Sequence, residues 1–470
     1  MRLDAAHRPH PALADARPEV FWLDDPGRPP ALPPLTGSHR AELVVVGGGY
    51  AGLWSALRAK ERDPACDVVL LEKDRCGDQG SGRNGGFASA SLTHGFTNGV
   101  ARWPEEMATL DRLGADNLAA IGAAVERYGI DCHWERTGEL TVARAPHEVD
   151  ELAGLATSLR SAGHDARLLT AEETQSRVAS PTYQGGLFEP DTTALVEPAR
   201  LAWGLRAACL ELGVRIHEGS PGLGVTRDLD GVRVTVPGGE VRADRVVLAT
   251  NAFPPLLRRL RLMTVPVYDY ALMTAPLSAA QRESVGWAAR EGVGDAASMF
   301  HYYRLTRDDR VLWGGYDAVY HYASRIDPAL EQAGPTHDLL AAQFFETFPH
   351  LEGLRFSHRW AGVIDTCTRF AAFYGTAYDG RVAYALGFTG LGVAATRFAA
   401  DVMLDLLAGE DTERTRLRMV RERPVPFPPE PVRSVGVQLT RWSMGRADAS
   451  GGRRNLWLRG LDRLGLGFDS

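Results

Sequence analysis

Cysteine is scarce in this chain of 470 residues. Its five cysteines are odd in number and widely spaced, and no Cys-x-x-Cys pair occurs. The pattern excludes a disulfide scaffold and offers neither a zinc-binding pair nor a dithiol motif, so we expect no metal site. Scattered cysteines without a pairing pattern are typical of proteins in a reducing compartment. Because residues 1–17 hold no apolar core of the length that a signal peptide needs, we expect a cytoplasmic protein.

Long apolar runs and an excess of positive charge are also missing. The longest apolar segment, residues 390–409, is interrupted by Arg397, Asp401 and Asp405. Charged side chains at those positions would be costly in hydrocarbon, so we expect no membrane insertion. Acidic residues number 59 against 52 basic ones, and the formal net charge is -7. Such a chain presents no basic field for phosphodiesters, so we expect no nucleic-acid partner.

Length and composition predict a globular protein of more than one domain. Single cores stop growing at roughly 250–300 residues, which this chain exceeds. Apolar residues make up 44% and charged residues 24%, close to the average for globular proteins. Residues 1–40 are rich in proline, which favours an extended arm rather than a helix.

A glycine turn follows the arm. Residues 43–46 are a short β-branched run, and the next six, Gly47-Gly48-Gly49-Tyr50-Ala51-Gly52, match G-x-G-x-x-G. A helix is predicted over 53–62 and a second strand over 68–71, ending at Glu72. In such a β-turn-α-β unit the glycines let the backbone approach a pyrophosphate and the acid accepts hydrogen bonds from a ribose. The unit predicts a dinucleotide site, but NAD and FAD share it.

Two later stretches favour FAD over NAD. Residues 80–87 (Gly-Ser-Gly-Arg-Asn-Gly-Gly-Phe) form a glycine-dense segment directly after the acidic strand, where backbone amides can line a heteroaromatic ring. Residues 383–392 predict a short strand, a glycine turn and a helix that runs to position 407. The N-terminus of that helix, aimed at flavin N1 and the C2 carbonyl, would stabilise the anionic reduced ring. The alternative for residues 80–87 is a flexible loop, and the alternative for residues 383–392 is a structural turn with no ligand.

Between these stretches the pattern of apolar residues predicts helices and then strands. Helical spacing occurs over 104–128 and 147–162, with acidic residues in the first turns. Alternation predicts strands, and this half of the chain is expected to form an antiparallel platform. The predicted strands cover residues 232–236, 241–249, 268–275, 298–306 and 310–315.

Taken together, these stretches resemble the FAD-dependent amine oxidases of the D-amino-acid oxidase and glycine/sarcosine oxidase superfamily, nearest to its γ-glutamylputrescine oxidoreductase-like members. The resemblance runs from Phe21 to the end of the chain and includes residues 249–252, 265–270, 303–306 and 360–366. It implies an α/β protein in which a Rossmann-like FAD-binding domain is interleaved with an antiparallel-sheet substrate domain. The expected boundaries are an arm at 1–40, the FAD-binding domain at 41–100, 190–265 and 360–410, the substrate-binding domain at 101–189 and 266–359, and a C-terminal extension at 411–470.

The resemblance also implies which residues hold FAD. Cys367 lies near the region where some sarcosine oxidases attach the flavin, but the surrounding sequence does not match that motif, so we expect non-covalent FAD. The expected cofactor-binding residues are Gly47, Gly49, Tyr50, Ala51, Gly52, Glu72, Lys73, Ser81, Arg83, Asn84, Gly85, Gly86, Thr250, Asn251, Gly387, Phe388, Thr389, Gly390, Leu391 and Gly392.

The implied reaction is hydride transfer from an amine-bearing carbon to flavin N5, giving an imine that water hydrolyses to an aldehyde or keto acid. A small amine or amino acid is the expected substrate, with a γ-glutamylputrescine-like compound favoured. The expected catalytic groups are aromatic walls, two arginines that bind a carboxylate and a histidine that adjusts the protonation of the amine. The alternatives are that the arginines are solvated surface groups and that the histidine is structural. The expected catalytic residues are His301, Tyr303, Arg304, Arg369, Tyr270 and Trp360, with Tyr268 as a further wall.

Several questions stay open at the level of sequence. Lys60 and Lys73 are the only lysines, and both belong to the nucleotide-binding half. Because some flavin oxidases activate oxygen with a lysine, the acceptor is oxygen or another compound, and a dehydrogenase is an alternative. A flavin monooxygenase is another, since residues 294–297 superficially match its Gly-Asp motif, although they precede a strand. The tail is expected to pack on the body, a partner surface being the alternative. The sequence does not indicate an oligomeric state.

Overall fold

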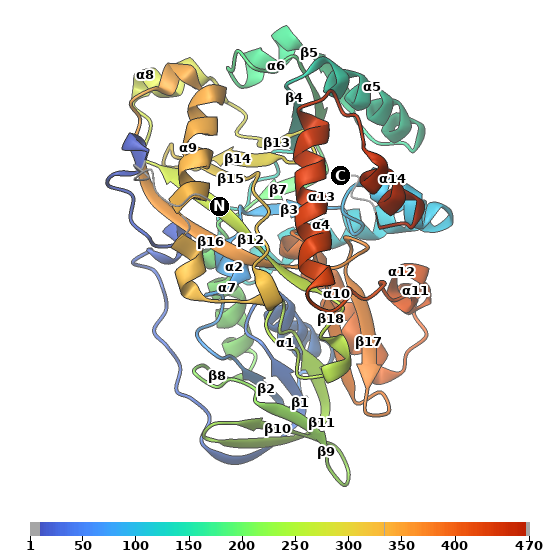
Figure 1. The fold of residues 1–470 in the computed structure, drawn as a ribbon. Helices are drawn as coiled ribbons and strands as arrows, with labels where there is room; N and C mark the ends of the chain where they lie inside the picture. Colours follow the sequence, from blue (N-terminus) through green and yellow to red (C-terminus); the bar gives the residue numbers. More distant parts are fainter. Residues whose placement is uncertain (1–9, 333, 467–470) are drawn as a thin grey trace.

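The computed structural model describes residues 10–332 and 334–466. Two sheets lie one above the other, with the first in the lower part of Figure 1 and the second in the upper part. The chain crosses between them several times, because strands of each sheet come from both halves of the sequence. The two interleaved units expected from the sequence are therefore present.

The first sheet is built on the predicted β-turn-α-β unit. Its central strands are parallel, and their valine-rich runs are buried on both faces, as parallel strands require. The edge strand β17 is antiparallel to β18, and the β9–β10 hairpin pairs with β11. The sheet consists of β17 (Phe373–Ala377), β18 (Val382–Leu386), β11 (Gly239–Leu248), β1 (Gly37–Val46), β2 (Val68–Leu71) and β8 (Arg215–His217), with β10 (Val232–Val236) and β9 (Gly224–Arg227) beside it.

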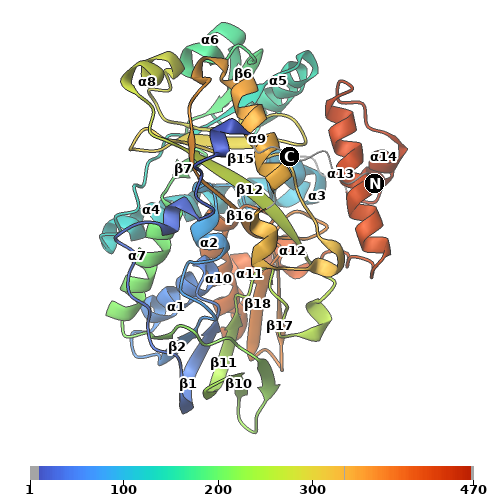
Figure 2. The ribbon, with the colours of Figure 1, turned by 60° about the vertical axis from the view of Figure 1, so that its left-hand side comes forward.

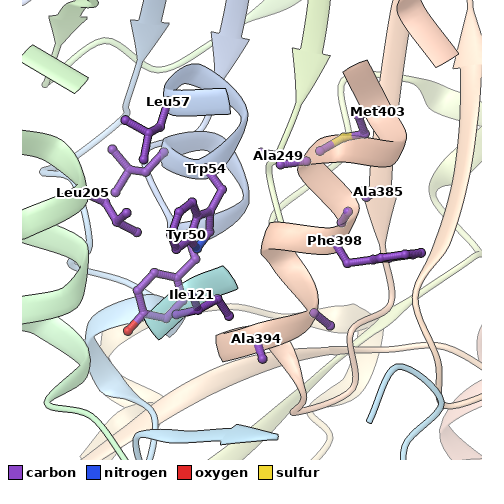
Figure 3. Close-up of a cluster of buried hydrophobic side chains, with 14 of the residues drawn as sticks. Tyr50, Trp54, Leu57, Ile121, Leu205, Ala249, Ala385, Ala394, Phe398 and Met403 are labelled. Carbon is purple, nitrogen blue, oxygen red and sulfur yellow. The ribbon is translucent and has the colours of Figure 1, made fainter. Parts of the chain in front are cut away.

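Helices bury an apolar core against one face of this sheet. Figure 3 shows Trp54 and Leu57 of α1 facing Leu205 of α7, while Phe398 and Met403 belong to α10 on the other side of the cluster. These large side chains are almost fully removed from water, which is the main favourable term for the domain. The covering helices are α1 (Tyr50–Arg62), α4 (Met107–Arg127), α7 (Pro198–Glu211) and α10 (Gly392–Ala408).

The second sheet forms the platform above the first. All its pairs are antiparallel except β4 with β13. Helix α9 (Gly334–Thr347) packs on one face, and the other face looks toward the first domain. In order, the strands are β16 (Phe356–Thr366), β12 (Val265–Thr274), β15 (Val311–Gly315), β14 (His301–Leu305), β13 (Gly292–Asp295), β4 (Glu139–Ala143), β6 (Gly185–Glu189) and β5 (Arg167–Thr170).

The remaining elements connect and cover the two sheets. A two-stranded sheet of β3 and β7 lies between them, and the C-terminal helices pack outside. Among the described residues, no helix is both long and apolar enough to cross a bilayer. These elements are β3 (Phe87–Ser89), β7 (Thr193–Leu195), α2 (Gly80–Arg83), α3 (Phe96–Arg102), α5 (Pro146–Ser161), α6 (Ala171–Arg177), α8 (Ala279–Val285), α11 (Glu413–Arg416), α12 (Arg418–Arg421), α13 (Val432–Asp448) and α14 (Leu456–Arg463).

The positions of helices and strands predicted from local patterns agree with the structure more closely than the predicted assignment of strands to sheets. The helices expected over 104–128 and 147–162 are present as α4 and α5. Strands β10 and β11, expected in the platform, pair within the first sheet instead, because β11 lies beside β1. Strand β1 begins before residue 41, and β16 stays in the second sheet beyond residue 360. Alternation alone does not say which sheet a strand joins.

Candidate functional site

The glycine turn at the end of β1 has a backbone that only glycine permits. Gly47 adopts φ +111°, and a Cβ there would lie 2.3 Å from the carbonyl oxygen of Ala249. A Cβ on Gly52 would lie 1.8 Å from the carbonyl oxygen of Gly47, so α1 packs directly on the turn. A Cβ on Gly49 would lie 2.9 Å from Ser81 Oγ. The N-terminus of α1 is thereby exposed to an incoming anion, as in dinucleotide sites.

Glu72 ends β2 beside this turn. Its carboxylate accepts hydrogen bonds from the backbone N–H groups of Gly48 (2.6 Å) and Asp74 (2.8 Å). Burial raises the pKa of Glu72, while the two N–H donors lower it. Both oxygens are held in place and keep lone pairs for ribose hydroxyls. Lys73 follows, with Nζ 4.1 Å from the ring centroid of Phe253.

The segment at residues 80–87 is ordered by side-chain hydrogen bonds rather than flexible. Ser81 Oγ accepts from the backbone N–H of Tyr50 at 2.8 Å, which ties the segment to the start of α1. Asn84 donates to the carbonyl oxygens of Gly80 and Ser81 and accepts from the N–H of Gly86 at 2.8 Å. The segment is therefore held in one conformation next to the glycine turn.

The second glycine turn leads from β18 into α10. The N–H groups of Gly387 and Phe388 donate to the carboxylate of Asp365, at 2.5 and 3.2 Å. Burial raises the pKa of Asp365 to about 7. Thr389 (φ 50°) and Gly390 (φ 93°) then turn the chain so that α10 begins at Gly392. Asp365, which the sequence patterns did not single out, sets the position of this turn.

These three stretches meet around one cavity of about 2390 Å³. Gly52, Gly86 and Gly387 lie just behind its wall, where each packs against backbone or side chains. The other expected cofactor residues line the cavity: Gly47, Gly49, Tyr50, Ala51, Glu72, Lys73, Ser81, Arg83, Asn84, Gly85, Thr250, Asn251, Phe388, Thr389, Gly390, Leu391 and Gly392.

The second sheet contributes a polar pair to the same cavity. Tyr302 of β14 donates its hydroxyl hydrogen to the carboxylate of Asp269 of β12, and both residues line the cavity. The tyrosine ring fits because its neighbours are glycines: a Cβ on Gly85 or Gly314 would lie 2.6 Å from it. Burial raises the pKa of Asp269 to about 6. Sequence reasoning missed both residues, although each is one position away from a residue that it named.

Strand alternation explains that displacement. None of the six expected catalytic residues lines the cavity. Tyr303 points to the opposite face of β14, where its hydroxyl lies 2.6 Å from that of Tyr183. Tyr270 likewise donates to the carbonyl oxygen of Leu330 at 2.7 Å, and both rings belong to the core under α9. Successive side chains of a strand alternate between faces, so Tyr302 and Asp269 reach the cavity where Tyr303 and Tyr270 do not. Tyr268, the further expected wall, does line the cavity.

His301 has a structural environment. Its Nδ1 lies 2.7 Å from Asp295, its Nε2 lies 3.0 Å from Gln343 Oε1, and its ring stacks on Trp313 at a centroid distance of 4.5 Å. The side chain is 1% exposed. Asp295 itself lines the cavity. Although burial opposes this, the hydrogen bond from His301 and the charge of Arg144 hold the pKa of Asp295 below its ordinary value.

The remaining three expected residues bind backbone carbonyls. Trp360 donates to Arg83 at 2.9 Å, and Arg304 donates to Val196. Burial lowers the pKa of Arg304 to about 10. The guanidinium of Arg369 donates to four carbonyl oxygens and thereby joins β17 to the C-terminal extension. These acceptors belong to Ala371, Ala372, Met419 and Glu422.

The residues present fit a flavin dinucleotide. The turn at Gly47 and Gly49 leaves room that a Cβ would fill, Glu72 stands beside it, and the start of α10 faces the same cavity. Cys367 lies outside the cavity lining and directs its Sγ toward the carbonyl oxygen of Ala371 at 3.2 Å. Among residues 10–332 and 334–466, no group of three or more His, Cys, Asp or Glu side chains is arranged to hold a metal ion.

Known sequences agree with this geometry. Residues 42–406 match the model of the DAO family, described as FAD dependent oxidoreductase. The chain is 31% identical over 391 residues to γ-glutamylputrescine oxidoreductase of Escherichia coli, covering 81% of this chain and 86% of that protein. It is 28% identical over 404 residues to the probable oxidoreductase OrdL of Haemophilus influenzae, covering 83% of this chain and 88% of that protein.

A solved structure shares the fold. The crystal structure of glycine oxidase from Geobacillus kaustophilus superimposes with a TM-score of 0.67 at 20% identity. The superposition covers 80% of this chain and 96% of that one. At this identity the likeness concerns the fold alone.

Proposed function

Since the chain belongs to the DAO family of FAD-dependent oxidoreductases, we propose that it oxidises the C–N bond of a small amine or amino acid. One observation carries the proposal. The nucleotide cradle and the polar pair of Asp269 and Tyr302 line the same cavity, so a flavin held by the cradle has a substrate wall above it. The imine formed by oxidation would be hydrolysed by water to an aldehyde or keto acid.

FAD, when bound without a covalent link, would be the oxidant and would take up the hydride lost from the carbon next to the substrate nitrogen. The protein's own groups bind and orient it. The backbone at Gly47 and Gly49 and the N-terminus of α1 hold the pyrophosphate, and Glu72 accepts hydrogen bonds from the adenosine ribose. The N-terminus of α10 lines the same cavity, and its positive partial charge would favour the anionic form of a reduced flavin ring.

Asp269 is the group that we assign to the substrate amine. Its pKa of about 6 leaves the carboxylate mostly ionised at neutral pH, so it can take a proton from a substrate ammonium group. Tyr302 holds one of its oxygens through a hydrogen bond. Phe87 also lines the cavity, and its ring centroid lies 5.9 Å from that of Tyr302, so it shields one side of the pair from water. Arg304 and Arg369 have no part in this scheme, because both are occupied by carbonyl oxygens.

For the substrate itself we propose a γ-glutamylputrescine-like amine. The support is the 31% identity to an enzyme of that name across most of both chains. An amino acid such as glycine is the second candidate, supported by the 24% identity over 310 residues to the glycine oxidase of Geobacillus kaustophilus.

The test is an anaerobic titration of the purified holoprotein, monitored by the absorbance of oxidised flavin. We expect γ-glutamylputrescine to bleach the flavin, with putrescine, glycine and sarcosine as comparisons. The variant Asp269→Asn is expected to retain FAD and to bleach at least about tenfold more slowly, because it cannot accept the proton. A flavin that stays oxidised through the whole panel would overturn the proposal.

The electron acceptor is tested in the same cuvette. Neither lysine lies on the substrate wall: Lys60 is buried and donates to the carbonyl oxygen of Cys66 at 3.0 Å, and Lys73 stands beside Glu72 at the ribose end. This arrangement favours a dehydrogenase with an acceptor other than oxygen. Slow recovery of the flavin band on admission of air, but fast recovery with an artificial quinone, would support that assignment, and fast recovery in air would refute it.

A further inference from the structure

The C-terminal helix α13 lies over the cavity although it is outside the matched family region. That region ends at residue 406, whereas α13 spans Val432–Asp448. Figure 2 shows α13 and α14 as a layer at one side of the body, next to the second sheet. Side chains of α13, including Val437, Thr440 and Met444, line the same cavity as Asp269 and Tyr302.

Specific contacts fix α13 to the substrate sheet. The carboxylate of Asp448 accepts hydrogen bonds from the backbone N–H groups of Ser298 (3.2 Å) and Met299 (2.9 Å), in the loop before β14. Arg441 forms an ion pair with Asp317, just after β15. The helix is thus attached to the two loops that flank Tyr302. Charge-assisted hydrogen bonds of this kind are directional, so they set the distance between the helix and the sheet.

The two faces of α13 differ in character. The outer face carries Trp442, which is 58% exposed and does not line the cavity. On the inner face the charged side chains are already paired, Arg433 with Glu430 and Arg441 with Asp317. What α13 offers to the cavity near Met444 is therefore mostly apolar surface. Methionine is flexible and adapts to aliphatic chains.

We propose that α13 is a specificity-determining wall of the substrate cavity, which accepts the aliphatic chain of an extended amine and limits its length. This inference rests on the proposed function, since it concerns the substrate of the same site. The reacting amine lies at Asp269, and the part of the molecule beyond it extends along α13. Substrates that are too short to reach α13 gain nothing from this contact.

The position of α13 is tested without any turnover. In Met444→Cys the new thiol faces the cavity, and in the matched control Trp442→Cys it faces solvent. We expect the thiol at position 444 to react with a maleimide at least about tenfold more slowly than the one at 442, because access is blocked. Equal rates would refute the placement of α13, whatever the enzyme oxidises.

The effect on specificity is tested with Met444→Trp, which fills the cavity, using γ-glutamylputrescine and putrescine as long and short amines. We expect KM for γ-glutamylputrescine to rise at least about tenfold, while kcat and the KM for putrescine stay within about twofold. Trp442→Ala, at a position that is exposed and outside the cavity lining, should behave as the unmodified protein. An equal rise for both amines, or none, would overturn the inference. If the unmodified protein oxidises neither amine, the proposed function fails instead, and the thiol labelling alone decides the placement of α13.

Discussion

The closest backbone approach in the nucleotide cradle is the one between Gly52 and Gly47. A Cβ on residue 52 would lie 1.8 Å from the carbonyl oxygen of Gly47, whereas real Cβ atoms essentially never come closer than 3.0 Å to such an atom. In Gly52→Ala, α1 must therefore move away from the turn by at least about 1.2 Å, the difference between the two distances. That displacement moves the N-terminus of α1 away from the turn at Gly47 and so disturbs the pyrophosphate site.

Overpacking of this kind costs about 1–3 kcal/mol, and because the strain falls on the pyrophosphate site we expect FAD binding to weaken about tenfold to 100-fold. Quenching of FAD fluorescence during titration of the apoprotein measures the dissociation constant. The control is Gly445→Ala in α13, where a Cβ would meet nothing within 4 Å. That substitution should leave FAD affinity unchanged and favour the helix slightly. Unchanged FAD affinity in Gly52→Ala would refute the reasoning.

Three further substitutions test separate parts of the site. Glu72→Gln should weaken FAD binding about tenfold, because an amide accepts fewer of the hydrogen bonds that the carboxylate accepts. Glu42→Gln, at an exposed position of β1, should leave FAD affinity unchanged. Equal FAD affinities of the two variants would contradict the role of Glu72. Burial raises the pKa of Asp269 to about 6, so the unmodified protein should lose stability relative to Asp269→Asn as the pH rises from about 4 to about 6; parallel melting curves would contradict this. Arg369→Met should lower the unfolding free energy in urea by about 2–4 kcal/mol through its unpaired carbonyls and leave the KM of the amine unchanged.

Local patterns in the sequence were sufficient to predict the turns of the nucleotide-binding half. The glycine turn at residues 47–52, the acid at Glu72 and the turn at 387–392 depend on backbone conformations and short spacings within one β-turn-α unit. Such geometry is set by the residues that carry it, since a positive φ favours glycine and a Cβ contact below 3 Å with backbone excludes other residues. The family resemblance rested on the same features, and the match over residues 42–406 confirms it.

The substrate wall required the tertiary structure. Alternation predicted strands at 268–275 and 298–306 but did not say which face would meet the cavity, and the reasoning named Tyr303 and Tyr270 where Tyr302 and Asp269 face it. Neighbouring side chains of a strand lie on opposite faces, so the wrong choice of face exchanged Tyr302 for Tyr303 and Asp269 for Tyr270. Most aromatic side chains of these strands, including Tyr270 and Tyr303, belong to the core under α9, so aromatic residues did not mark the face that meets the cavity.

The sequence by itself determined the cofactor class and the cradle, because these depend on neighbours in the chain. Only the tertiary structure decided which polar groups are free to act. Arg369 is occupied by carbonyl oxygens as far along the chain as Glu422. Asp365 holds a turn 22 residues later, and Asp448 accepts a hydrogen bond from Met299 across 149 positions. Contacts at such separations arise from the packing of whole elements, and no local periodicity encodes them.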